Sequence, residues 1–101
     1  MFVMREVLHC KPGKVGELKK KFLALNAIVR QKGFEPFTIM TDVAGEQFWT
    51  LVLESEADSV ATFFAMEDQV MADKDAQQAM AGYHDLVVNG RRELFSSWCQ
   101  V

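Results

Sequence analysis

The spacing of the hydrophobic residues changes repeatedly along this chain, and the order of those changes restricts the fold more than any single motif does. Apolar residues alternate with others in residues 2–10 and then recur every three or four positions in residues 15–29. Two more alternating runs follow in residues 37–43 and 48–53, before a long helical stretch in 55–88 and a last alternating run in 93–99. Alternation is typical of strands and a 3.6-residue period of helices, so the pattern predicts the order β-α-β-β-α-β.

That order of elements is the split βαβ arrangement of a ferredoxin-like fold. We therefore predict an α+β protein with a four-stranded antiparallel sheet and both helical regions on one face. The 101 residues are enough for a single domain, residues 1–101. Hydrophobic residues make up 50% of the chain, although a domain of this size has little interior in which to bury them. We expect the other face of the sheet to be covered by a second copy of the chain, in an isologous homodimer.

Two helix faces are predicted from apolar residues at helical spacing. The first helix, which extends to about Lys32, presents a stripe formed by Val15, Leu18, Phe22, Leu25 and Val29. The second helical region is expected to break between residues 66 and 73, and its later part presents Ala76, Met80, Tyr83 and Val87. These stripes are the expected contacts with the sheet.

Turn and cap residues indicate where the elements end. Pro12 and Gly13 interrupt the first strand, because proline lacks the backbone donor that a strand needs. Gly33 is expected in the left-handed conformation that stops the first helix, and Gly45 is expected to have a positive φ in the hairpin.

The second helical region has its own boundary signals. Ser55 is the expected N-cap of the whole region, and Asp73 is the expected N-cap after the break. Asn89-Gly90 is typical of a helix stop, so the last strand is expected to begin near Arg91.

Charge and apolar run length exclude two classes of partner. The net charge of -3 argues against nucleic acid, since a phosphate-binding surface needs a basic excess. No apolar run approaches the roughly 18 residues that span a membrane, and the first residues lack the order of a signal peptide. We expect a cytoplasmic protein without a membrane partner.

The two cysteines are expected to remain free thiols. Cys10 ends the first strand and Cys99 lies near the end of the last, and these strands are antiparallel neighbours in a ferredoxin-like sheet. The two side chains then lie at opposite ends of the strand pair, too far apart for a disulfide. Their spacing relative to the histidines does not match a zinc site, and no metal is expected.

A few polar or bulky residues interrupt the apolar strands and are candidates for a ligand site. Arg5 and Glu6 lie on opposite faces of the first strand, and alternation alone leaves open which one faces the second copy. Glu93 occupies a similar position on the last strand, so these charges either pair across strands or orient a small ligand. His9 is either a hydrogen-bonded structural residue or a proton-transfer group or haem ligand at a pocket mouth, and Trp49 is either core or pocket wall.

The turn and helix-stop residues of the chain resemble those of the dimeric α+β barrel superfamily, and within it those of NIPSNAP-like and antibiotic-biosynthesis-monooxygenase-like domains. The matching features are Lys11-Pro12-Gly13-Lys14, the glycines Gly33 and Gly45, the tail 73–90, and Arg92-Glu93 opening the last strand. The resemblance implies a homodimer, and some monooxygenase-like relatives oxidise aromatic polyketides without a cofactor.

Other relatives degrade haem, using an asparagine on the first strand, a tryptophan on a strand and a histidine on the second helix. The first strand here has no asparagine, Trp49 matches by residue type, and His84 lies late in the helical tail. The resemblance therefore argues against haem, and no cofactor is expected.

The sequence predicts a homodimeric barrel that binds a small, partly apolar molecule, with monooxygenase-like chemistry if it is an enzyme. Its predicted ligand contacts are Arg5, His9, Trp49 and Glu93, and its candidate catalytic groups are His9 and Arg5. The alternative is a non-catalytic NIPSNAP-like scaffold dimer with a filled barrel and charges paired to one another.

Overall fold

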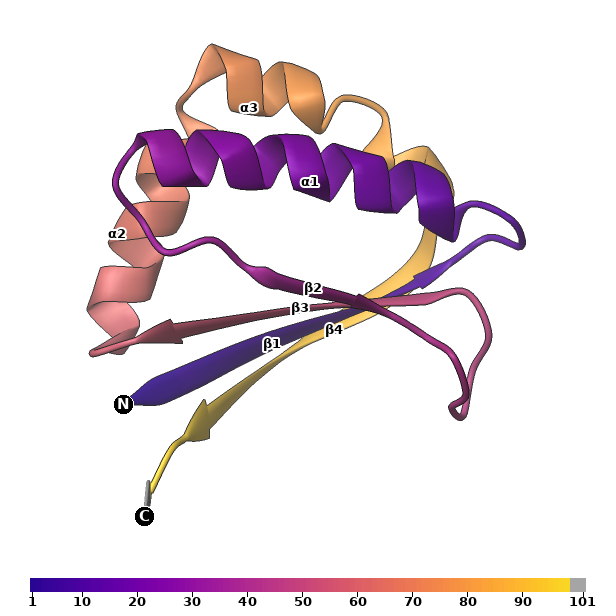
Figure 1. Ribbon diagram of the computed structural model, residues 1–101, viewed down its shortest axis with the longest axis horizontal. Helices are drawn as coiled ribbons and strands as arrows, with labels where there is room; N and C mark the ends of the chain where they lie inside the picture. The colour runs from indigo at the N-terminus through magenta and orange to yellow at the C-terminus, as the bar shows by residue number, and fades with distance from the viewer. Residues whose placement is uncertain (99–101) are drawn as a thin grey trace.

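The computed structural model describes residues 1–98, which form one antiparallel sheet with all helices on one side (Figure 1). Its strands are β1 (Phe2–Cys10), β2 (Thr38–Thr41), β3 (Thr50–Ala57) and β4 (Val87–Ser96). Its helices are α1 (Val15–Gln31), α2 (Val60–Met71), α3 (Lys74–Ala79) and the 3-10 turn η1 (Tyr83–Leu86). The strand order is β2-β3-β1-β4 and each neighbouring pair is antiparallel, which confirms the predicted α+β, ferredoxin-like fold. Cys99 lies outside the described residues.

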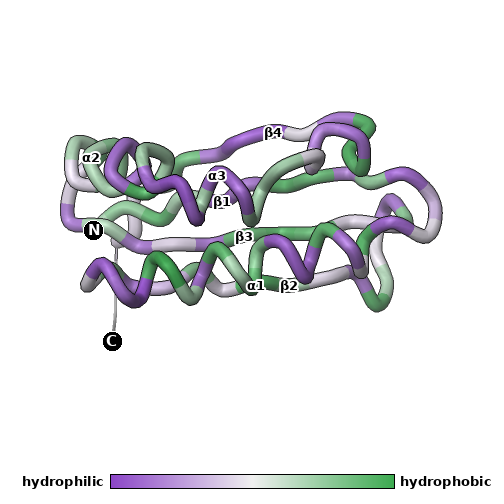
Figure 2. The backbone as a smooth tube through the Cα atoms, turned by 90° about the horizontal axis from the view of Figure 1, so that it is seen from above, coloured by the Kyte–Doolittle hydropathy of each residue, from purple (hydrophilic) through white to green (hydrophobic). Residues whose placement is uncertain are grey.

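The core lies between the sheet and the helices, as the stripes predicted. Helix α1 lies along β2 and β3, and α3 lies beside α1 (Figure 2). Leu18 and Val29 of the α1 stripe have no exposed surface, and neither does Leu51 at the centre of β3. From the second stripe, Ala76 and Met80 are buried and Tyr83 and Val87 pack against the core at its edge. The face of the sheet away from the helices carries no element of the described chain (Figure 1).

The third strand is longer than predicted, and the second helix begins later. The sequence predicts that residue 55 begins the second helical region, but residues 54–57 continue β3 and pair with residues 2–5 of β1. Ser59, not Ser55, is the N-cap of α2, and its hydroxyl accepts a hydrogen bond from the Thr62 amide at 3.0 Å. Cross-strand pairing with β1 therefore outweighs the local helix signal of Ser55.

The last strand also begins earlier than predicted. Asp73 caps α3 as expected, accepting from the amide of Ala76 at 3.1 Å, but the helical tail ends before Asn89-Gly90. Gly90 lies inside β4 opposite Leu8, and a β-carbon at this position would lie 2.7 Å from Leu8 Cδ2. A side chain at position 90 would thus require Leu8 to shift and would crowd the Val7 carbonyl oxygen, 3.2 Å away, and Gly90 does not act as a helix stop.

The β2–β3 hairpin places its strained residue where the sequence did not predict it. Gly33 has the expected φ of +85°, but the positive φ in the hairpin belongs to Trp49, at 59°, and not to Gly45. The carbonyl of Trp49 accepts a hydrogen bond from the Cys10 amide at 2.8 Å, which holds this backbone against the end of β1. Strand β2 stops at Thr41, so the expected strand residue Val43 lies in the loop and is fully exposed.

Candidate functional site

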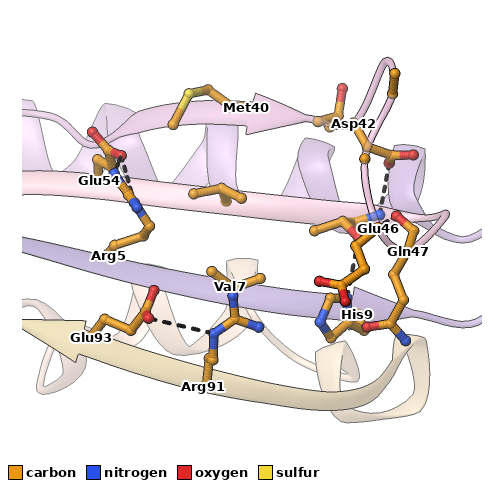
Figure 3. Close-up of a pocket in the computed structure, with 15 residues that line it drawn as sticks. Arg5, Val7, His9, Met40, Asp42, Glu46, Gln47, Glu54, Arg91 and Glu93 are labelled. Carbon is orange, nitrogen blue, oxygen red and sulfur yellow. Dashed lines mark hydrogen bonds and ion pairs between the residues drawn. The ribbon is translucent and has the colours of Figure 1, made fainter.

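Alternation along β1 decides which charged residue faces which side. Glu6 points toward the helices, whereas Arg5 and His9 point to the face that the helices leave open (Figure 3). In the strand register, Arg5 lies directly between Glu54 of β3 and Glu93 of β4. The structure therefore answers the question that the sequence left open about Arg5 and Glu6.

A hollow of about 470 Å³ lies on the open face, beside the hairpin between β2 and β3 (Figure 3). We call it the open-face hollow; its lining residues are Arg5, Val7, His9, Met40, Thr41, Asp42, Ala44, Gly45, Glu46, Gln47, Thr50, Val52, Glu54, Arg91 and Glu93. Val7 is buried and provides an apolar floor together with Val52. The hollow therefore combines an apolar base with charged and polar side chains around it.

The central charges of the hollow pair across and along the strands. The Arg5 guanidinium lies 2.7 Å from the Glu54 carboxylate and 5.4 Å from the centre of the Phe95 ring. Glu93 lies 3.8 Å from Arg91, two residues earlier on the same strand. Arg5 and Glu93 are thus neighbours in the sheet, but each has a different ion-pair partner.

His9 is held at one end of the hollow by the first residue of β3. Its Nδ1 lies 3.1 Å from Thr50 Oγ1, and that hydroxyl donates its only proton to the Gln47 carbonyl at 3.0 Å. The hydroxyl must then accept from Nδ1–H, which assigns the proton to Nδ1 in the neutral imidazole. In that tautomer Nε2 carries the lone pair, which is the form that can accept a proton.

Trp49 lies apart from the other predicted contacts. It borders a separate hollow of about 390 Å³ with Val15, Thr41, Asp42 and Phe48, and 41% of its surface is exposed. The structure therefore brings three of the four predicted ligand contacts together, namely Arg5, His9 and Glu93.

A second charged group lies on the helix side of the same sheet, where the sequence predicted no site. The Arg92 guanidinium is 3.1 Å from the Glu6 carboxylate and 3.0 Å from that of Glu67 on α2. Burial lowers the pKa of Arg92, but the two carboxylate charges outweigh that effect and raise it. This triad borders a pocket of about 240 Å³ whose other walls are mostly apolar. Alternation places Glu6 and Arg92 on one face, but no sequence signal links them to Glu67.

The thiol of Cys10 is buried and is not placed as a reactive group. Desolvation raises its pKa, and the charge of Asp42 raises it further. A raised pKa keeps the thiol protonated and weakly nucleophilic.

Within residues 1–98, no three histidine, cysteine or acidic side chains are grouped so that they could hold a metal ion. No helix in that part of the chain has the length and apolar character needed to cross a membrane.

Comparisons with known proteins identify other proteins that have this fold. No protein-family model matches the sequence, and neither does any curated protein. Among solved structures, a NIPSNAP domain protein from Burkholderia xenovorans superposes with a TM-score of 0.81 at 17% identity, over 100% of both chains. A NIPSNAP family protein of unknown function from Agrobacterium tumefaciens gives 0.79 at 14% identity, over 94% of this chain and 86% of that one.

The monooxygenase side of the expected resemblance also has a structural neighbour. An antibiotic biosynthesis monooxygenase-like protein from Nitrosomonas europaea superposes with a TM-score of 0.74 at 11% identity, over 96% of this chain and 98% of that one. The superpositions establish the fold, whereas sequence identities this low leave the activity open. The chain has the fold shared by NIPSNAP and antibiotic biosynthesis monooxygenase-like proteins, as its sequence predicted.

Proposed function

We propose that the chain forms a homodimer through the open face of its sheet, and that the open-face hollow binds a small, partly apolar molecule. The observation that carries this proposal is the hollow itself, about 470 Å³ on a face that no described helix covers. Ligand sites in proteins commonly occupy about 300–1,000 Å³ and combine apolar walls with a few polar groups. A second copy across the hollow would enclose it.

The composition of the open face supports an interface that also holds a ligand. By register, Val3, Val7, Val52 and Phe95 share this face with the Arg5–Glu54 ion pair. A mosaic of apolar and charged groups fits a cavity with orienting contacts better than it fits a dry contact between two sheets.

His9 supplies the group on which a catalytic form of the proposal depends. Its Nε2 lone pair, fixed by the Nδ1 contact with Thr50, would remove a proton from the bound molecule. Monooxygenase-like chemistry is the reaction class that the Nitrosomonas europaea neighbour suggests for such a site, and we propose that it proceeds without a cofactor.

A second candidate function is a non-catalytic scaffold dimer. It is favoured by the pairing of Arg5 with Glu54 at 2.7 Å, since charges that satisfy one another need no ligand. The Agrobacterium tumefaciens neighbour, a NIPSNAP family protein of unknown function, has the same fold. In this case a second copy would fill the hollow with its own side chains.

Native mass spectrometry of freshly purified protein tests the proposal, because it reports oligomeric state and bound mass together. We expect a dimer at twice the 11.5 kDa chain mass, carrying a reproducible small adduct. Arg5→Ala and His9→Ala should keep the dimer and lose the adduct, whereas Lys20→Ala on the outer side of α1 should keep both. A clean dimer in every preparation would favour the scaffold function, and a monomer would contradict both candidates.

The adjacent residues Phe95 and Leu94 provide a matched test of the interface. Both lie on β4 and are about half exposed, at 44% and 48%, but they point to opposite faces of the sheet. An isologous interface loses the side chain from both copies, so a cost of about 1 kcal/mol per copy weakens the dimer by about 2 kcal/mol, or roughly 30-fold. We expect Phe95→Ala to raise the dimer dissociation constant by about that factor and Leu94→Ala to leave it nearly unchanged; equal effects would argue against the open face.

A further inference from the structure

We propose that the molecule held in the open-face hollow is a small organic cation, a protonated amine on a short apolar body. This inference rests on the proposed function and adds the charge and chemical class of the ligand. It comes from the balance of charges around the hollow, from how those charges are paired, and from the apolar floor beneath them.

Carboxylates outnumber guanidinium groups around the hollow. The carboxylates come from Asp42, Glu46, Glu54 and Glu93, and the guanidinium groups from Arg5 and Arg91. The only histidine on the lining, His9, has its Nδ1 proton committed to Thr50. With four carboxylates and two guanidinium groups, the hollow has a net negative charge in either form of the imidazole and attracts cations.

The pairing of these groups concentrates the unbalanced charge at the hairpin end. Arg5 is held by Glu54 at 2.7 Å, so an anionic ligand would have to displace that carboxylate to gain a strong contact. The Asp42 carboxylate accepts a hydrogen bond from the Thr50 amide at 2.7 Å, and this bond leaves the charge of the carboxylate in place. Within residues 1–98, neither Asp42 nor Glu46 has a cationic partner within ion-pair distance, and both lie at the His9 end (Figure 3).

The rest of the lining favours an organic cation over a metal ion. No three potential ligands among the described residues are grouped closely enough to coordinate a metal. Val7, Val52 and Met40 instead provide an apolar surface beside the carboxylates. A short apolar body would lie on that surface while its ammonium group approaches Asp42 and Glu46.

Enclosure of the hollow by a second copy would strengthen this preference. Charges interact more strongly as water is excluded, because the effective dielectric constant falls. An isologous dimer also brings each charge into the interface twice, so the excess of carboxylates is doubled. A bound cation in each hollow would offset that repulsion, and the ligand should therefore favour the dimer.

Matched probes that differ in charge test the inference. Benzylamine, benzyl alcohol and benzoate, together with butylamine, butanol and butyrate, are titrated into 15N-labelled protein and followed by amide shifts. We expect each amine to shift the amides of His9, Thr50 and Val52 and to bind at least about tenfold more tightly than its alcohol, with the carboxylates weakest. Higher salt should weaken the amines selectively.

Two variants with the same change in charge locate the effect. Glu46→Gln removes a carboxylate from the hollow and should weaken amine binding about threefold to tenfold. Glu56→Gln removes one from the same strand face outside the hollow and should change it less than about twofold. An alcohol or carboxylate that binds these residues more tightly than the amine would overturn the cation and leave the proposed function standing. Absence of shifts in the hollow with every probe would contradict both.

Discussion

Both faces of the sheet carry arginine–glutamate ion pairs, but the pairs connect different parts of the molecule. On the helix side, Arg92 joins Glu6 on β1 to Glu67 on α2, so its charges link the sheet to the helix layer. On the open side, Arg5 and Glu54 pair within the sheet and contact no other layer of the described chain. An ion pair that joins two layers contributes to their packing, whereas a pair within one layer chiefly shapes the surface. The side chains of both groups are exposed to a similar degree, so the number of layers that the ion pairs join, and neither burial nor residue type, separates the structural charges from the candidate ligand-binding charges.

The largest expected difference between the faces concerns apolar truncation in β3. Leu51 is fully buried under the helices, and its neighbour Val52 lines the open-face hollow. Leu51→Ala should lower the free energy of unfolding by about 2–5 kcal/mol, since it removes buried methyl groups and leaves a cavity. Val52→Ala should cost about 1 kcal/mol or less. Urea unfolding at protein concentrations low enough to keep the copies apart measures both, and similar losses would mean that the open face is packed within one chain.

Glycine replacement tests how tightly the helix side of the sheet is packed at the edge strand β4. A β-carbon at Gly90 would lie 2.7 Å from Leu8 Cδ2 and 3.2 Å from the Val7 carbonyl oxygen. Gly90→Ala should therefore destabilise the protein by about 1–3 kcal/mol through overpacking. Gly45→Ala, in the hairpin beside the hollow, meets nothing within 4 Å and should be close to neutral. Thermal unfolding of the two variants compares them, and a neutral Gly90→Ala would show that Leu8 can move aside.

Replacing the two arginines by methionine compares the charges directly. Arg92→Met leaves Glu6 and Glu67 facing each other without a cation and should cost about 1–2 kcal/mol after allowance for their partial exposure. Arg5→Met removes a pair at the open surface and should cost less than about 1 kcal/mol, while changing ligand binding. Chemical denaturation with a parallel native mass spectrum separates stability from binding, and a costlier Arg5→Met would reverse the assignment of the two faces.

The smallest expected effect is an acid dependence at the start of α3. A hydrogen bond from Lys32 and the backbone amides at the helix start lower the pKa of Asp73. The folded state therefore favours the carboxylate, so its contribution is complete above the unfolded pKa of about 3.9 and is lost as the pH falls through the lower folded value. Asp73→Asn should be less stable than the parent protein at pH 7, and the difference should close as the pH falls through the lowered pKa of Asp73. Asp75→Asn, next in that helix turn, is the control, and a gap that persists at low pH would exclude the charge as its cause.

Periodicity predicted most of the fold because buried side chains impose it directly. Short-range patterns predicted the α1 stripe that contains Leu18 and Val29, and they predicted the Asp73 cap. They also predicted that the helices cover one side of the sheet. The errors occurred where distant partners decide. Residues 54–57 are held in β3 by pairing with β1, and Gly90 packs closely against Leu8, more than 80 residues earlier in the sequence.

The candidate site was predictable to the same extent and for the same reason. Strand alternation and register bring Arg5, His9 and Glu93 to one hollow, which the sequence could suggest. The contribution of the hairpin, including Asp42 and Glu46, depends on a loop whose path is set by the backbone of Trp49. No periodic signal reports such a path, so the acidic end of the hollow was missed.

The most direct test of the central claim is a filtered nuclear Overhauser experiment on a refolded mixture of 13C-labelled and unlabelled protein. It detects contacts between copies and ignores those within one. We predict contacts between copies from the Val3 methyl groups and the Phe95 ring, which share the open face but do not line the hollow, and none from Leu23 on the outer side of α1. Contacts confined to the helix side, or the absence of contacts from both Val3 and Phe95, would contradict a dimer that encloses the open-face hollow.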